Sequence, residues 1–207
     1  MKIFSIAEAI ILVTALGLAV LRSLPGPVFF PVRMLAIAYA DFFRGVPTIL
    51  VIALLGFGAP ALAIEGVPTS TTFWGVVSLV LIYTAYVSEV YRAGIESVHP
   101  SQEAAARSLG LTRGQALASV VLPQAVRRVI PPLLNDFIGL QKDTALVGIV
   151  GAVEAFKQAQ IEVSADFNFT HYLVAATLFV AITIPLARFT DWLVARDRRR
   201  RMAGAPA

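Results

Sequence analysis

Long apolar segments alternate with short polar ones along most of this 207-residue chain. A helix needs on the order of 20 consecutive apolar residues to cross a bilayer. The pattern therefore predicts an all-α membrane protein with about five transmembrane helices in one domain over residues 1–207. The predicted spans cover about residues 3–21, 43–64, 72–95, 125–153 and 171–192.

The composition agrees with this pattern and excludes several kinds of chemistry. Hydrophobic residues make up 57% of the chain and charged residues 14%, against roughly 25% charged in soluble domains. There is no cysteine, so disulfides and thiol catalysis are excluded. His99 and His171 are far apart in sequence and have no partner at metal-ligand spacing, so no metal site is expected.

The first apolar segment has a second interpretation. Lys2 precedes an apolar core, as in a secretory signal peptide, but no small-residue cleavage site follows it. We therefore treat this segment as the first span.

The distribution of arginine predicts the orientation of the chain, because cytoplasmic loops carry an excess of Lys and Arg. Arginines are frequent between spans one and two, between spans three and four, and after span five, whereas the loops over residues 58–71 and 156–170 carry few. This alternation places the N-terminus outside and the C-terminus in the cytoplasm. The basic C-terminal cluster could suggest nucleic acid, but beside a span it is more typical of contact with anionic lipid.

The cytoplasmic segment over residues 101–121 is polar and rich in helix-ending signals. Ser101 is predicted to cap a short helix, and Gly110 supplies its left-handed end. Thr112 and Gln115 have capping-box spacing, so a second helix is expected from there to Pro123. The segment therefore predicts a helix–turn–helix elbow.

Three functions are compatible with such an elbow. A helix lying on the bilayer would present large apolar residues on one face, but here that face is mostly alanine, with Leu109 the one large apolar residue of the first helix. A DNA-reading elbow tethered between two spans would have poor access to DNA. Small residues allow another surface to approach closely, so docking of a protein is favoured.

Several motifs, in the right order, resemble the permease subunits of bacterial ATP-binding-cassette (ABC) importers, in the branch for polar amino acids. "FFRGVP" over residues 42–47 is similar to the family's "FFRGTP", and "SEVYRAGIESV" over residues 88–98 to its "AEIFRGGIxSV". The family's loop signature reads E-A-A, three residues, G, nine residues, I-x-L-P. Here nine residues separate Gly110 from "VVLP", and "KDTALV" over residues 142–147 resembles the branch-typical "KDTSL".

The resemblance implies the type I permease fold of methionine importers, with the elbow as a coupling helix docked on a separate ATPase subunit. Where the family has its signature glutamate, this chain has Ala104, and Glu103 lies one position early. Family members also have more chain before the first span. The ATPase contact is expected to involve Gln102, Glu103, Ala104, Ala105, Ala106, Arg107, Leu109 and Gly110.

The chain lacks the G-x-x-x-x-G-K-[ST] loop that binds nucleotide phosphates, so it is expected not to be an enzyme itself. By the resemblance, ATP and Mg²⁺ are bound by two partner ATPase subunits. The other expected partners are a second, identical or paralogous permease, an extracytoplasmic solute-binding protein, membrane lipid and the amino acid. No nucleic acid is expected.

Polar residues at membrane depth are the candidates for binding substrate, because a charge there costs roughly 2.5–3.5 kcal/mol on insertion scales. Glu154 follows a glycine-containing segment and is the preferred ligand for an α-ammonium or a basic side chain. It could also lie on the outer surface. The other candidates are Gln141 and Thr144 as neutral donors, Lys142 and Asp143, which could instead pair with other groups, and Glu89, for which an ion pair with Arg92 is favoured.

Two other functions remain open at this point. An ion-coupled secondary transporter or channel would work without ATP, but the internal repeat typical of that class is absent. Related ABC importers carry compatible solutes such as ectoine rather than amino acids, and no residue in the sequence distinguishes these substrates.

Overall fold

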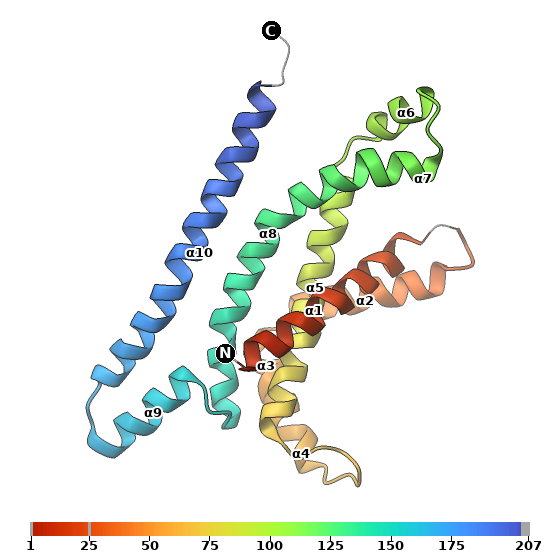
Figure 1. Cartoon of the computed structure of the whole chain (residues 1–207). Helices are drawn as coiled ribbons and strands as arrows, with labels where there is room; N and C mark the ends of the chain where they lie inside the picture. The colour runs from red at the N-terminus through yellow and green to blue at the C-terminus, as the bar shows by residue number, and fades with distance from the viewer. Residues whose placement is uncertain (1, 25, 204–207) are drawn as a thin grey trace.

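The computed structural model describes residues 2–24 and 26–203, and it is built almost wholly from helices (Figure 1). About 85% of the chain is helical, and the described residues contain no strand. The predicted all-α membrane fold is therefore confirmed. The side chains of Arg198, Arg200 and Arg201, which belong to the basic C-terminal cluster, lie outside the described part.

The helices follow one another with short connections. The first half of the chain contains α1 (Lys2–Ser23), α2 (Phe30–Gly45), α3 (Thr48–Ala53), a π-helical turn η1 (Leu54–Gly58), α4 (Ala59–Ala61) and α5 (Thr71–Glu96). The second half contains α6 (Pro100–Ser108), α7 (Arg113–Ala116), a second π-helical turn η2 (Leu117–Val121), α8 (Leu122–Asp143), a 3₁₀ segment η3 (Thr144–Val150), α9 (Ala155–Asp166) and α10 (Thr170–Ala203).

Four described helices are long and apolar enough to cross a membrane, at Lys2–Ser23, Thr71–Glu96, Arg113–Val150 and Thr170–Arg196. A fifth crossing requires α2 and the helix Thr48–Ala61 to act as one span, although they are bent by 101°. The apolar pattern predicts one continuous span over residues 43–64. The break occurs because Val46 is extended, as residues before proline tend to be, and Pro47 has no N–H to continue α2.

A second difference concerns Pro123, where the sequence predicts a helix end. The chain instead continues as a helix from Arg113 to Val150. The π-helical turn η2 directly precedes the proline, and the Leu122 N–H bonds back to the Leu117 carbonyl. This wider turn accommodates a residue that has no N–H and would clash in a regular α-helix.

A third difference is α9 (Ala155–Asp166), which occupies much of the stretch over residues 156–170 that is predicted to be a loop. It lies at the same end of the molecule as α4 (Figure 1). The elbow formed by α6 and α7 lies at the opposite end, on the side toward which the C-terminal end of α10 points (Figure 1).

The apolar core lies where α1, α5 and α8 cross. Its largest fully buried side chains include Ile11, Leu79, Ile82, Leu140 and Val147. Helix α10 packs mainly on α8 and α9, and it leaves large apolar residues such as Leu173 and Leu178 exposed. In a membrane these faces meet lipid or another subunit.

Candidate functional site

The elbow is stabilised by local hydrogen bonds. Helix α6 begins at Pro100, and His99 rather than Ser101 is its N-cap, with Nδ1 accepting from the Ser101 backbone N–H at 3.2 Å. The prediction of a Ser101 cap is wrong because proline favours the first helical position and forces the residue before it into the extended form that an N-cap needs. Gly110 has φ +89° at the end of α6, as predicted.

Contacts between the two arms close the elbow. Thr112 and Gln115 form the predicted capping box at the start of α7. Arg113 on α7 lies 3.6 Å from Glu103 on α6, and the Gln124 amide donates to the Gln102 side chain at 3.3 Å. The glutamate that stands one position early is thus used within the elbow.

Most of the residues expected to contact an ATPase are accessible. Only Ala106 is buried, and Glu103 is half-buried. Leu109 is 82% exposed, although it is the one large apolar residue of the arm. An exposed leucine at the tip of a polar bend forms an apolar projection that a partner groove could cover.

Three of the predicted substrate ligands line one cavity. Gln141, Thr144 and Glu154 meet in a space of about 280 Å³, with walls from α1, α8 and α10 that include Phe4 and Phe179. Gln141 is buried, and its Oε1 accepts from Thr183 Oγ1 on α10 at 3.0 Å. Thr144 Oγ1 donates to the Gln141 backbone carbonyl at 2.7 Å.

Glu154 is half-buried and also caps α9. Its Oε1 accepts from the Lys157 backbone N–H at 2.7 Å, and its Oε2 accepts from that of Phe156 at 2.8 Å. Each carboxylate oxygen retains acceptor capacity for a further donor. Gly148 lies so close that a Cβ atom there would be 2.8 Å from Glu154 Oε1.

Lys142 and Asp143 face different surroundings and do not pair with each other. The Asp143 carboxylate accepts from the Tyr83 hydroxyl at 3.0 Å. Lys142 lines a neighbouring cavity of about 440 Å³ with Phe156 and Tyr172, whose rings stack at 5.8 Å. Both cavities include Phe179 in their walls. Within the described residues no carboxylate lies within 4 Å of the Lys142 ammonium.

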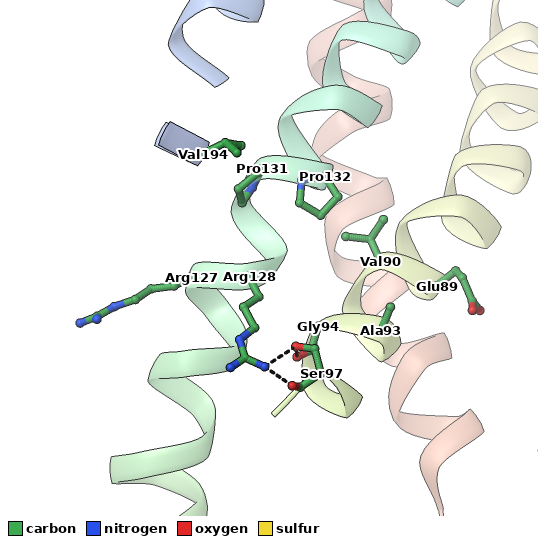
Figure 2. Close-up of a pocket in the computed structure, with 10 residues that line it drawn as sticks. All are labelled: Glu89, Val90, Ala93, Gly94, Ser97, Arg127, Arg128, Pro131, Pro132 and Val194. Carbon is green, nitrogen blue, oxygen red and sulfur yellow. Dashed lines mark hydrogen bonds between the residues drawn. The ribbon is translucent and has the colours of Figure 1, made fainter. Parts of the chain in front are cut away.

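A larger groove of about 500 Å³ lies nearer the elbow, between α5, α8 and α10 (Figure 2). Glu89 is on its rim, but the carboxylate points away from the groove (Figure 2). The polar groups that border the groove are Ser97, Arg127 and Arg128.

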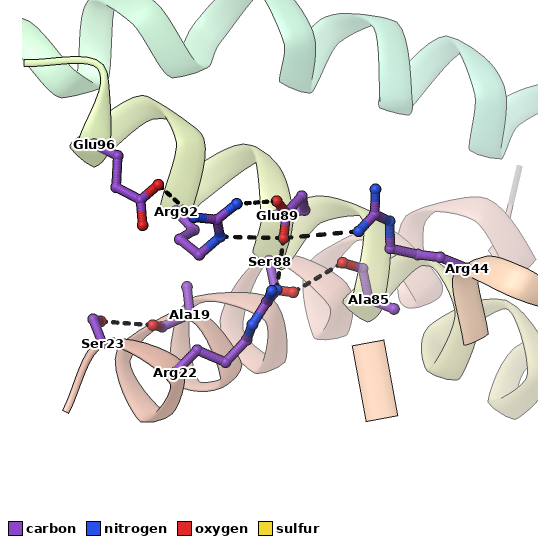
Figure 3. A network of polar contacts seen from close by, with 9 residues as sticks. All are labelled: Ala19, Arg22, Ser23, Arg44, Ala85, Ser88, Glu89, Arg92 and Glu96. Carbon is purple, nitrogen blue, oxygen red and sulfur yellow. Dashed lines mark hydrogen bonds and ion pairs between the residues drawn. The ribbon is translucent and has the colours of Figure 1, made fainter. Parts of the chain in front are cut away.

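The Glu89 carboxylate is held by arginines from three helices (Figure 3). Arg92, one turn along α5, forms the predicted ion pair with it. Arg22 at the end of α1 lies 2.8 Å away, and Arg44 at the end of α2 lies 3.9 Å away. Arg92 also pairs with Glu96. Glu89, which is also a candidate substrate ligand, therefore lies in an ion-pair cluster.

Sequence reasoning missed the two arginines that approach from other helices. Their spacing from Glu89 is not local, so no helical periodicity connects them. Asp41 and Arg44 have the same local spacing, but these two described residues form no ion pair within 4 Å, and Arg44 faces Glu89. The signal available in the sequence was the recurrence of arginine at helix ends.

Comparisons with known proteins identify the family of this chain. Residues 26–200 match the model of the family described as the binding-protein-dependent transport system inner membrane component. The chain belongs to this family of membrane transport subunits. It is a multi-pass membrane protein and, within the family, resembles the permeases of amino-acid ABC transporters.

Among curated relatives, the probable glutamine ABC transporter permease GlnM of Bacillus subtilis is 36% identical over 172 residues, which are 82% of this chain and 77% of that protein. The probable amino-acid ABC transporter permease PatM of Vibrio harveyi is 35% identical, over 76% of this chain and 71% of that protein. The arginine transport system permease ArtQ of Bacillus subtilis is 32% identical, over 81% and 76%.

Two solved structures share the architecture. The crystal structure of an amino acid ABC transporter with histidines matches with a TM-score of 0.83 and 30% identity, over 94% of this chain and 89% of that one. The methionine ABC transporter MetNI, in an inward-facing conformation, matches with a TM-score of 0.72 and 18% identity over 94% and 91%. The second match supports the fold alone.

Proposed function

We propose that this chain is the transmembrane subunit of an ATP-driven importer that moves a polar amino acid into the cell by alternating access. The observation that carries the proposal is the combination, in one chain of this family, of a polar membrane cavity and an exposed elbow at one end of the helices.

The elbow is connected directly to the core. Helix α6 follows α5 after three residues, and α7 continues through η2 into α8. Displacement of the elbow by a closing ATPase dimer would therefore move two helices that line the apolar core. Alternating access needs such rigid-body motion of packed helices about a central site.

The partners follow from this role. Two ATPase subunits would bind ATP and Mg²⁺ and hold the elbow. This role would put the elbow and the C-terminus in the cytoplasm, with the N-terminus outside. A second permease, identical or paralogous, is expected because a set of about five helices rarely encloses a path by itself. An extracytoplasmic solute-binding protein would deliver the substrate at the end that carries α4 and α9.

The substrate class follows from the cavity and from the relatives for glutamine and arginine. Glu154 would bind the α-ammonium or a basic side chain, with Gln141 and Thr144 as neutral partners. Lys142, in the adjoining cavity, would attract the α-carboxylate.

Reconstitution tests the function. The chain, produced with a cognate ATPase and placed in vesicles, should couple ATP hydrolysis to uptake across a panel of polar amino acids presented with the binding protein. Uptake that runs on an ion gradient without ATP would show a secondary transporter. Uptake of ectoine but of no amino acid would show an importer for compatible solutes.

Testing the role of Glu154 needs variants that separate its charge from its function as the N-cap of α9. Glu154→Asn keeps a good N-cap but removes the charge, and Glu154→Asp keeps both. A charge-assisted hydrogen bond contributes about 1.5–3 kcal/mol, so Glu154→Asn should raise the KM for uptake about tenfold or more. Glu154→Asp should remain closer to the parent, and equal KM values in all three proteins would remove Glu154 from the site.

A further inference from the structure

The groove between α5, α8 and α10 combines an apolar wall with a cationic end. Val90, Ala93, Pro131, Pro132 and Val194 form the wall. The two arginines lie at the end nearer the elbow, where Arg128 points to Ser97 and Arg127 extends outward away from it, and the prolines and Val194 lie at the other end (Figure 2). The proposed transport function assigns no role to this groove.

The charge at this end is not neutralised within the described residues. Arg128 is oriented by hydrogen bonds to the Ser97 carbonyl and, at 3.1 Å, to Ser97 Oγ. Arg127 is exposed and has no ion-pair partner in the described part of the chain. Glu89, the acid on the rim, is already bound by Arg22 and Arg92.

The two prolines add backbone acceptors to the same region. Pro131 and Pro132 have no N–H, so the carbonyls four residues earlier, those of Arg127 and Arg128, receive no α-helical hydrogen bond from them. The carbonyls of Arg127 and Arg128 can therefore accept hydrogen bonds from a ligand hydroxyl at the cationic end.

The groove lies at the level of a membrane interface. Val194 is in the last turn of the candidate span Thr170–Arg196, and Ser97 directly follows the candidate span Thr71–Glu96. Basic pockets between transmembrane helices at this level suit anionic lipid headgroups.

We propose that this groove binds one anionic phospholipid. The phosphate contacts Arg128, with Arg127 adding positive charge beside it, the headgroup hydroxyls donate to the carbonyls of Arg127 and Arg128, and an acyl chain covers the wall formed by Val90, Pro131 and Val194. A free phosphate ion would leave that wall in contact with water. The proposal requires that the chain is inserted in a membrane. It rests on the proposed orientation in one respect only, which is that the bound lipid belongs to the cytoplasmic leaflet.

Lipid retention by the assembled transporter tests the site. The permease with its ATPase is assembled in nanodiscs of phosphatidylcholine and phosphatidylglycerol, released into detergent, and the retained lipid is counted by native mass spectrometry. One arginine near the headgroups corresponds to about a five-fold change in affinity, so Arg127→Gln should retain about five-fold less phosphatidylglycerol. Arg188→Gln is the control, because it removes an arginine that is 81% exposed and does not line the groove.

A second variant tests the apolar wall independently of the charges. Val194→Trp fills the groove while leaving both arginines in place, so it should also lose the lipid. Equal retention by Arg127→Gln, Val194→Trp and Arg188→Gln, or equal retention of phosphatidylcholine, would overturn the proposal.

A second copy of the chain is the competing occupant. The chain has no cysteine, so a thiol introduced by Val194→Cys reports on this position alone. If it crosslinks two permeases in the assembled transporter, the groove is a subunit interface and the lipid assignment fails. A lipid-filled groove leaves the thiol uncrosslinked.

Discussion

The Glu89 carboxylate lies 2.8 Å from the Arg22 guanidinium, across the contact between α5 and α1. The Arg22 side chain is only 8% exposed, so this pair is mostly hidden from solvent. Arg92 on α5 and Arg44 on α2 approach the same carboxylate. One acid thus joins the ends of three helices, on the helix that leads into the elbow.

Removing that acid should destabilise the protein strongly. Breaking a buried ion pair from one side costs about 3–5 kcal/mol, because a charge stays behind without a partner. Glu89→Gln leaves Arg22 in this position, whereas Arg44→Gln removes a more exposed and more distant arginine and should cost less than about 1 kcal/mol. In detergent, the thermal unfolding temperature of Glu89→Gln should therefore be well below that of Arg44→Gln.

A double-mutant cycle distinguishes the pair from general disruption. Since Arg22→Gln removes the stranded charge, the double variant with Glu89→Gln should lose less stability than the sum of the single losses. Additive losses would show that Arg22 and Glu89 do not interact.

The exposed Leu109 allows a test of the proposed coupling surface. Burying a leucine side chain against a partner contributes about 1.5–3 kcal/mol, so Leu109→Ala should weaken ATPase docking about tenfold and lower stimulated hydrolysis. Leu62→Ala truncates a leucine that is 68% exposed beside α4, at the other end of the molecule. Titration of the ATPase against both variants should show the loss for Leu109→Ala only.

The elbow was predictable because its signals are local. The left-handed Gly110 and the capping box of Thr112 with Gln115 depend on residues within one turn of one another. The error at Ser101 arose between two local rules, since Pro100 decides where the helix begins. Apolar length likewise identified α1, α5, α8 and α10.

The remaining differences depend on contacts between distant segments or on backbone adjustments. The cluster around Glu89 joins α1, α2 and α5, and the cavity of Gln141 and Glu154 needs α1 and α10 for its walls. The π-helical turn before Pro123 and the bend at Pro47 are two outcomes of the same residue type. No local pattern distinguishes them.

At the corner between α9 and α10, His171 is expected to lower the pKa of Asp166. The hydrogen bond from His171, and then that from the Asn168 backbone N–H, hold the pKa of Asp166 below its ordinary value of 3.8. A lowered pKa means that this carboxylate stabilises the corner above its ordinary value and that the effect is lost as the pH falls through the lowered pKa. His171→Ala should shift the Asp166 titration, followed by carboxyl-carbon NMR, upward toward 3.8; an unchanged midpoint would contradict this.

The contact between Gly148 and Glu154 gives the sharpest test of the cavity. A Cβ atom at position 148 would lie 2.8 Å from Glu154 Oε1, so Gly148→Ala must displace the carboxylate while leaving its charge in place. If Glu154 binds substrate, this variant should raise the KM for uptake several-fold, since a misplaced charge loses part of a hydrogen bond of about 1.5–3 kcal/mol. Gly17→Ala is the control, because a Cβ there meets nothing within 4 Å and alanine favours the helix. A KM that changes for neither variant, with both proteins folded, would mean that the position of the Glu154 carboxylate does not matter for transport.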